Sequence, residues 1–141
     1  SAVQAAPEVQ ERVTTLRAGL GRAAAAAGQS LWEFVVLGSY RFFDAPVVIV
    51  VSHHGQRADV SSFVTTMLLA AHDVGLGTCW LSSVVACQDE IKRLLNISDD
   101  KEILDGIALG YPVKGSPLNS FPRTRLPVEE VTTLLGFEDM D

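Results

Sequence analysis

An apolar segment that ends in two glycines and passes at once into a short strand most constrains the fold. It reads Leu68-Leu-Ala-Ala-His-Asp-Val-Gly-Leu-Gly-Thr-Cys-Trp-Leu-Ser82. From Val60 to Val74 apolar residues occupy almost every side, which predicts a helix that is buried all round, most easily in a subunit interface. Gly75 and Gly77 indicate the end of this helix, and residues 78–82 predict a short strand.

Three other segments have helical patterns. Pro7–Ala27 predicts a helix that begins with proline and stops at Gly28. Apolar residues mark one face of it: Val9, Val13, Leu16 and Leu20. Gln88–Leu95 is amphipathic, and Pro127–Leu135 predicts a final helix. The residues expected to face the core from the amphipathic segment are Ile91, Leu94 and Leu95.

Two segments predict central strands. Pro46–Val51 is a continuous β-branched run, typical of a strand that is covered on both faces. Ile103–Tyr111 is the second such segment, and it stops at Pro112. Leu31–Phe43 fits neither the helical nor the strand period. The alternation of helices and strands indicates an α/β layered domain.

Composition indicates one globular domain over residues 1–141, because 48% of the residues are hydrophobic and 20% are charged. The formal net charge of −6 argues against a nucleic-acid partner. No apolar run reaches the ~18–20 residues that a membrane span needs. The first residues do not have the pattern of a signal peptide. Cys79 and Cys87 fit neither a disulfide scaffold nor a CxxC motif, so we expect a reduced, cytoplasmic protein.

Later motifs carry a family resemblance. Ala108-Leu-Gly-Tyr-Pro112, Phe121-Pro-Arg-Thr-Arg-Leu-Pro127 and Leu135-Gly-Phe137 follow the Gly-Leu-Gly segment in that order. Over about Phe42–Phe137 the chain resembles the FMN-dependent nitroreductase family, in particular its nitrobenzoate-reductase branch. The resemblance implies an α/β (α+β) nitroreductase-like fold, with a central mixed sheet flanked by helices and an intertwined homodimer. The helix from Val60 to Val74 would form the core of that dimer.

The strand after the glycines is the candidate site for the flavin ring. In the family, this stretch lies against the isoalloxazine ring, and a backbone N–H contacts the ring nitrogen that accepts hydride. The resemblance gives that role to the Leu81–Ser82 backbone, with Trp80 and Ser83 on either side. The alternative interpretation is a core strand that simply buries a tryptophan and a cysteine.

Arg123 and Arg125 form the candidate phosphate site. Two cations at i and i+2 of an extended segment project to the same side, and the predicted helix N-terminus at Pro127 would add partial positive charge. The resemblance assigns both arginines to the FMN phosphate. The alternative interpretation is a solvated basic pair.

Other chemistry has weaker support. His53 and His54 are adjacent and no cysteine or carboxylate pattern accompanies them, so we expect no metal site. His72 is more typical of a hydrogen-bonded interface residue than of a base, and Cys79 of a packed thiol than of a nucleophile. We identify no side chain as an acid–base catalyst. The chain has no GxGxxG, P-loop or GxSxG motif.

The resemblance predicts an oxidoreductase that uses FMN and NAD(P)H to reduce a nitroaromatic, a quinone or a similar small acceptor. The family's first segment, of the type Arg-Arg-Ser-x-Arg, does not occur in this sequence. Three interpretations stay open. The chain is the C-terminal piece of an enzyme, with the remaining segment supplied by a partner chain or lost. It is a shortened flavin-binding protein. Or it is a partner subunit without catalysis of its own.

Overall fold

The computed structural model describes residues 7–54, 57–123 and 125–136. Its centre is a sheet of three strands, β1 (Val47–His53), β2 (Gly77–Leu81) and β3 (Glu102–Gly110), in the order β1-β3-β2. The three predicted strands are confirmed to within two residues at each end. Both pairings are antiparallel, so the sheet expected to be mixed is antiparallel throughout the described part of the chain.

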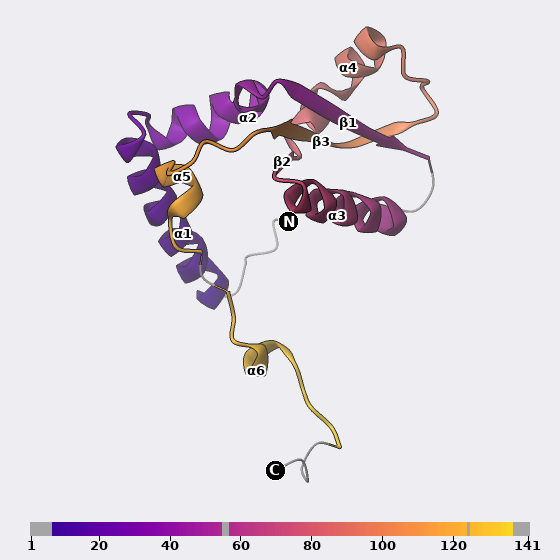
Figure 1. Cartoon of the computed structure of the whole chain (residues 1–141). Coiled ribbons are helices and arrows are strands. Elements are labelled where there is room, and N and C mark those ends of the chain that lie inside the picture. Colours follow the sequence, from indigo (N-terminus) through magenta and orange to yellow (C-terminus); the bar gives the residue numbers. More distant parts are fainter. Residues whose placement is uncertain (1–6, 55–56, 124, 137–141) are drawn as a thin grey trace.

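Helices and helical turns precede, connect and follow the strands, and several of them lie to one side of the sheet (Figure 1). They are α1 (Pro7–Ala26), the π-helix η1 (Glu33–Leu37), α2 (Gly38–Tyr40), η2 (Phe42–Asp44), α3 (Arg57–Asp73), η3 (Ser83–Cys87), α4 (Gln88–Leu95), α5 (Pro117–Ser120) and α6 (Val128–Val131). In Figure 1, α3 runs beneath the sheet. α1 and α5 lie against each other to the left of the sheet, and α6 stands away from the other elements.

The central strand β3 is the most buried element of the sheet. Its residues from Ile103 to Ala108 are all buried, as expected for a strand with a neighbour on each side. β1 is less covered than its β-branched run predicts, because Val47 and Val48 are exposed. A β-bulge between Val51 and Ser52 interrupts the β1–β3 register. Such bulges bend a strand and redirect its side chains.

Helix α3 packs one side against the sheet. Val64 is fully buried in a cluster with Val51, Leu104 and Ile107. On the opposite side of α3, Phe63 is 63% exposed and Leu69 is 67% exposed. The helix is confirmed, but the described residues of this chain cover only one of its apolar sides. Burial all round would therefore need a covering segment or chain beyond the described residues.

The other face of the sheet is covered by η2 and η3. Gly106 in β3 lies beneath the Phe42 ring and the Val84 side chain, which occupy the space where a Cβ would lie. Phe42, Phe43 and Asp44 all have positive φ, at 51°, 53° and 55°. A left-handed turn of three non-glycine residues is strained, since each residue brings its Cβ close to a carbonyl oxygen.

The part of α1 that is buried differs from the face that the apolar pattern predicts. The helix ends as expected before Gly28, whose φ is 75°. Its stripe of large apolar residues is mainly exposed: Val9, Val13 and Leu16. The buried residues are Ala23 and Ala24, from the alanine run. The buried face of α1 therefore lies near its C-terminal end and not along the predicted stripe.

Two predictions at the other helices are wrong. Leu94 and Leu95 do not face the core but are exposed, because no described element covers that side of α4. The predicted helix Pro127–Leu135 is a single turn, α6, after which Thr132 is extended. Isolated helices shorter than ~12 residues are marginal in water, and the apolar residues of this segment gain no packing.

Candidate functional site

The predicted ring-binding segment lies at an open edge of the sheet. β2 pairs with β3 on one side, and within the described residues its other side has no strand neighbour. Edge strands present unpaired backbone N–H and C=O groups. Leu81 is buried, Trp80 is 37% exposed, and the chain turns at Ser82 into η3. None of the residues from Trp80 to Ser83 lines either cavity described below, so their contact with a flavin ring stays a prediction.

A groove of about 610 Å³ opens where β2 begins and β3 ends. Cys79 and Ala108 line it from the strands, and the rings of Phe34, Phe43 and Phe121 line it from the surrounding segments. The volume is within the range of small-molecule and cofactor sites, and such sites are mostly apolar. The strand ends and the segment from η1 to η2 therefore border a space suited to a largely apolar ligand.

Gly77 and Gly110 pair with each other where the strands enter the groove. A Cβ on Gly110 would lie 2.9 Å from Cδ of Pro46, and one on Gly77 would lie 3.3 Å from Cβ of Pro112. Prolines therefore occupy the space that side chains would fill at both positions. This packing explains the glycines at the strand ends without any contact to a ligand.

Arg123 reaches the groove and comes close to β2. Its guanidinium carbon lies 5.2 Å from the centre of the Phe121 ring, and its side chain lines the groove together with Cys79. Burial raises the pKa of the Cys79 thiol, and the positive charge of Arg123 opposes this rise. The structure thus brings one predicted phosphate ligand beside the strand that was predicted to hold the ring.

The second predicted phosphate ligand is placed differently. Arg125 has an interaction of its own and does not line the groove. Thr124, which links the two arginines, lies outside the described residues. The predicted contribution of a helix N-terminus at Pro127 is weakened, because α6 has only four residues and its dipole is correspondingly small.

Sequence reasoning missed Asp105, which is the polar partner of the ring segment. The Ser82 Oγ donates a hydrogen bond to Oδ1 of Asp105 over 2.6 Å, and Asp105 is only 5% exposed. Next to it, the Ser83 Oγ is buried and has no hydrogen-bond partner. The available signal was a single acidic residue inside the apolar run of β3.

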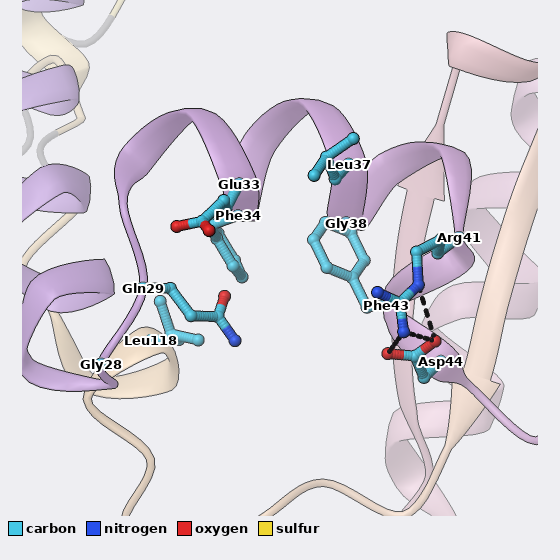
Figure 2. A pocket seen from close by; sticks show the side chains of 10 residues that line it. All are labelled: Gly28, Gln29, Glu33, Phe34, Leu37, Gly38, Arg41, Phe43, Asp44 and Leu118. Carbon is cyan, nitrogen blue, oxygen red and sulfur yellow. Dashed lines mark hydrogen bonds and ion pairs between the residues drawn. The ribbon is translucent and has the colours of Figure 1, made fainter.

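A second cavity, of about 370 Å³, has the lining shown in Figure 2 and shares Phe43 with the groove. The Phe43 ring packs against Phe34 at 5.1 Å between centroids, and both residues line both cavities. Arg41 binds Asp44 through Nε and Nη2, as Figure 2 shows. This ion pair and the Phe43 ring stabilise the left-handed turn that separates the two cavities.

Beside this cavity, the helical segment that contains η1 begins with a capping box, in which two residues exchange hydrogen bonds. The Ser30 N–H donates to Oε2 of Glu33, and the Glu33 N–H donates to Oγ of Ser30. These bonds from Ser30 lower the pKa of the Glu33 carboxyl. The capping box explains why a helix begins in a segment whose apolar pattern predicted neither period.

The histidines do not join the groove. His53 is buried with both ring nitrogens lacking a hydrogen bond, and Oε2 of Glu102 is 4.0 Å from its Nε2. His54 and His72 are exposed. In the described part of the chain, no three His, Cys, Asp or Glu residues gather as metal ligands would. Among the same residues, no helix is both long and apolar enough to cross a bilayer.

Solved structures share this fold. The FMN- and NADPH-dependent nitroreductase NfnB from sphigopyxis sp. strain HMH matches with a TM-score of 0.79 and 19% identity, over 97% of this chain and 66% of that chain. The FMN-dependent nitroreductase NfnB from Mycobacterium smegmatis, in complex with NADPH, matches with a TM-score of 0.75 and 22% identity, over 95% of this chain and 62% of that one.

Curated relatives share the sequence. A 4-nitrobenzoate reductase from Nocardioides sp. is 32% identical over 76% of this chain and 45% of its own length. A 4-nitrobenzoate reductase from Pseudomonas putida is 30% identical over 71% of this chain and 46% of its own. The chain therefore spans less than half the length of these relatives.

The family model described as "Nitroreductase family" matches residues 2–111. The match begins well before Phe42, so the N-terminal helix is part of the family's pattern although no quoted motif lies in it. It ends before Arg123 and Arg125, whose role stays a prediction. With most of its length matched, the chain belongs to the nitroreductase family.

Proposed function

We propose that this chain is an oxidoreductase that binds FMN and uses NAD(P)H to reduce a nitroaromatic, a quinone or a similar small acceptor. One observation carries the proposal: the groove at the ends of β2 and β3 brings Arg123 beside Cys79. A cation and the ends of two strands thereby meet around one largely apolar space. A flat aromatic ligand with an anionic tail needs that combination.

The residues present fit part of an FMN molecule. The groove has aromatic walls and a volume of about 610 Å³. Gly77, Thr78 and Cys79 of β2 line it. The segment Trp80–Ser83 is not among the residues that line the groove, so its contact with the ring is part of the proposal. The phosphate has one cation in the groove, Arg123, and a second close in the chain, Arg125.

Each residue has a defined task in this proposal. The Leu81–Ser82 backbone donates to the ring, with Trp80 and Ser83 beside it, and Arg123 and Arg125 bind the phosphate. Bound FMN would supply the redox chemistry, by taking a hydride from the nicotinamide and passing it to the acceptor. The protein orients the ring and limits access to it. No side chain of the groove is assigned proton transfer.

The relatives support the choice of acceptor class. The matched Nocardioides and Pseudomonas proteins are 4-nitrobenzoate reductases, and the matched structures are of FMN-dependent nitroreductases, one of them with NADPH. A nitroaromatic acceptor is the simplest extension of these activities to the present chain. Because the chain covers under half of the curated relatives, its substrate and its choice between NADH and NADPH belong to the proposal.

We also propose a homodimer. The outer side of α3 exposes Phe63 and Leu69, and α1 exposes Val9, Val13 and Leu16. Large exposed apolar patches usually mark interaction sites. A second copy with the same α3 face could bury its apolar side against this one, which accounts for a helix that is apolar all round.

The first experiment is a visible absorption spectrum of the purified protein, before and after addition of FMN, followed by NAD(P)H oxidation with 4-nitrobenzoate. Bands of bound flavin together with acceptor-dependent oxidation are expected. A protein that takes up no FMN, even in excess, contradicts the proposal.

The second candidate is a flavin-binding or partner subunit without catalysis of its own. The observation behind it is the coverage of 45% of the Nocardioides relative. Bound FMN that NAD(P)H cannot reduce, under conditions that reduce free FMN through a reference reductase, would favour this candidate. Turnover by the purified chain excludes it.

A further inference from the structure

Asp105 occupies an unusual place for a carboxylate. It lies in the central strand β3 between the buried residues Leu104 and Gly106, and it is 5% exposed. Burying a charged group is unfavourable unless hydrogen bonds compensate for lost water. The bond from the Ser82 Oγ, at 2.6 Å, compensates in part. A buried carboxylate at this position therefore needs an explanation other than stability.

The register explains which part of the chain the carboxylate controls. Leu81, the last residue of β2, pairs with Gly106, so Asp105 lies beside the point where the chain leaves the sheet at Ser82. On its other side Asp105 pairs with Val51, next to the place where the β1–β3 register shifts. Asp105 thus connects the middle of the sheet to the first residue of the turn into η3.

The Ser82 hydroxyl is used in an uncommon way. Ser82 precedes η3 with φ −88° and ψ −3°, and its side chain makes no capping hydrogen bond. A serine before a helix usually accepts a bond from a backbone N–H of the first turn. Here the hydroxyl donates to Asp105 instead. The turn is closed by the backbone, with the Val85 N–H donating to the Ser82 carbonyl oxygen over 3.2 Å.

We propose that Asp105 is a positioning residue for the flavin ring, acting through Ser82. By drawing the hydroxyl toward β3, it sets the orientation of the Leu81–Ser82 backbone at the open edge of the sheet. It also keeps the hydroxyl from accepting the N–H groups of the next turn. This inference rests on the proposed function, because it names the side chain that aligns the proposed ring contact.

A double-mutant cycle tests the proposal. Ser82→Ala and Asp105→Ala are each expected to raise the dissociation constant of FMN about 10-fold, the effect of losing one hydrogen bond to a charged group. The double variant should also show a rise of about 10-fold, not about 100-fold, because both changes remove the same interaction. Additive effects, or unchanged affinity in either single variant, would overturn the proposal.

Conservative variants separate positioning from general damage. Asp105→Asn keeps an oxygen that accepts the Ser82 hydroxyl, so FMN affinity should return to within about 3-fold of the unaltered protein. Asp99→Asn makes the same chemical change at an exposed turn and should leave affinity unchanged. If Asp105→Asn is folded but binds FMN as weakly as Asp105→Ala, loss of the hydrogen bond to Ser82 does not explain the lower affinity for FMN.

Hydrogen exchange of the FMN-free protein gives an independent readout. The Val85 amide should exchange about 10-fold faster in Ser82→Ala and Asp105→Ala than in the unaltered protein, because the turn that protects it is no longer held. Unchanged exchange in both variants refutes the positioning role. If the unaltered protein takes up no FMN, the proposed function has failed, and exchange alone then decides whether Asp105 orders the turn.

Discussion

The Phe42 ring fills the space above Gly106 where any other residue would have its Cβ. A Cβ built there lies 2.6 Å from Cε1 of Phe42 and 2.9 Å from Cγ1 of Val84. Phe42 has little freedom to retreat, because it belongs to the left-handed turn and has φ 51°. This contact joins the central strand to the turn that separates the two cavities.

Gly106→Ala is therefore expected to destabilise the protein by about 1–3 kcal/mol, the usual effect of forcing extra volume into a packed site. Gly19→Ala is the matched control. It lies in α1, and a Cβ there meets only Cδ2 of Phe121 at 3.7 Å. Since alanine favours a helix more than glycine, this control should stabilise by up to about 1 kcal/mol. Urea unfolding measures both, and equal free energies of unfolding would contradict the packing at Gly106.

Replacing both Arg123 and Arg125 by alanine should weaken FMN binding by ~10²-fold or more, if each contributes a charge-assisted contact to the phosphate. Arg93→Ala, which removes a cation paired with Glu90 on α4, is the control and should leave affinity unchanged. Fluorescence titration with FMN measures the dissociation constants. Unaltered affinity in the double variant would exclude the phosphate role.

The closeness of Arg123 to Cys79 predicts a change in thiol reactivity. Burial raises the pKa of the Cys79 thiol and Arg123 opposes this rise, so Arg123→Ala should raise the pKa further. Because the thiolate is the reactive form, alkylation of Cys79 should then need a higher pH. The pH profile of iodoacetamide labelling, in a Cys87→Ser background, measures the shift. A profile that stays unchanged, or moves to lower pH, would show that Arg123 does not lower the pKa of the thiol.

Two neighbouring residues of α3 should respond differently to the same charge. Val64 is fully buried within the chain, so Val64→Asp should unfold the protein by leaving an unpaired charge in the core. Phe63 is exposed, so Phe63→Asp should leave the fold intact and dissociate the proposed dimer. Circular dichroism and analytical ultracentrifugation distinguish these outcomes. A stable dimer with Phe63→Asp would refute this interface.

The strands and α3 could be predicted from local pattern, because each has a run of apolar residues typical of one kind of element. The β-branched run of β1 and the glycines after α3 each specify structure within a few residues of sequence. The same reasoning failed for α6 and for the inner face of α4. In both cases the outcome depended on whether another element was present to cover Leu94 or Leu134, and a local pattern contains no information about that.

The sequence by itself determined the three strands, the helices α1, α3 and α4, and the family, and it predicted the segments that could hold a flavin. Only the tertiary structure decided how these segments meet. It joined Arg123 to Cys79 across the groove, placed Asp105 behind Ser82, and put Phe42 over Gly106. The physical reason is that each of these contacts joins residues far apart in the chain. Such contacts form only when the sheet register and the packing of its two faces are settled together.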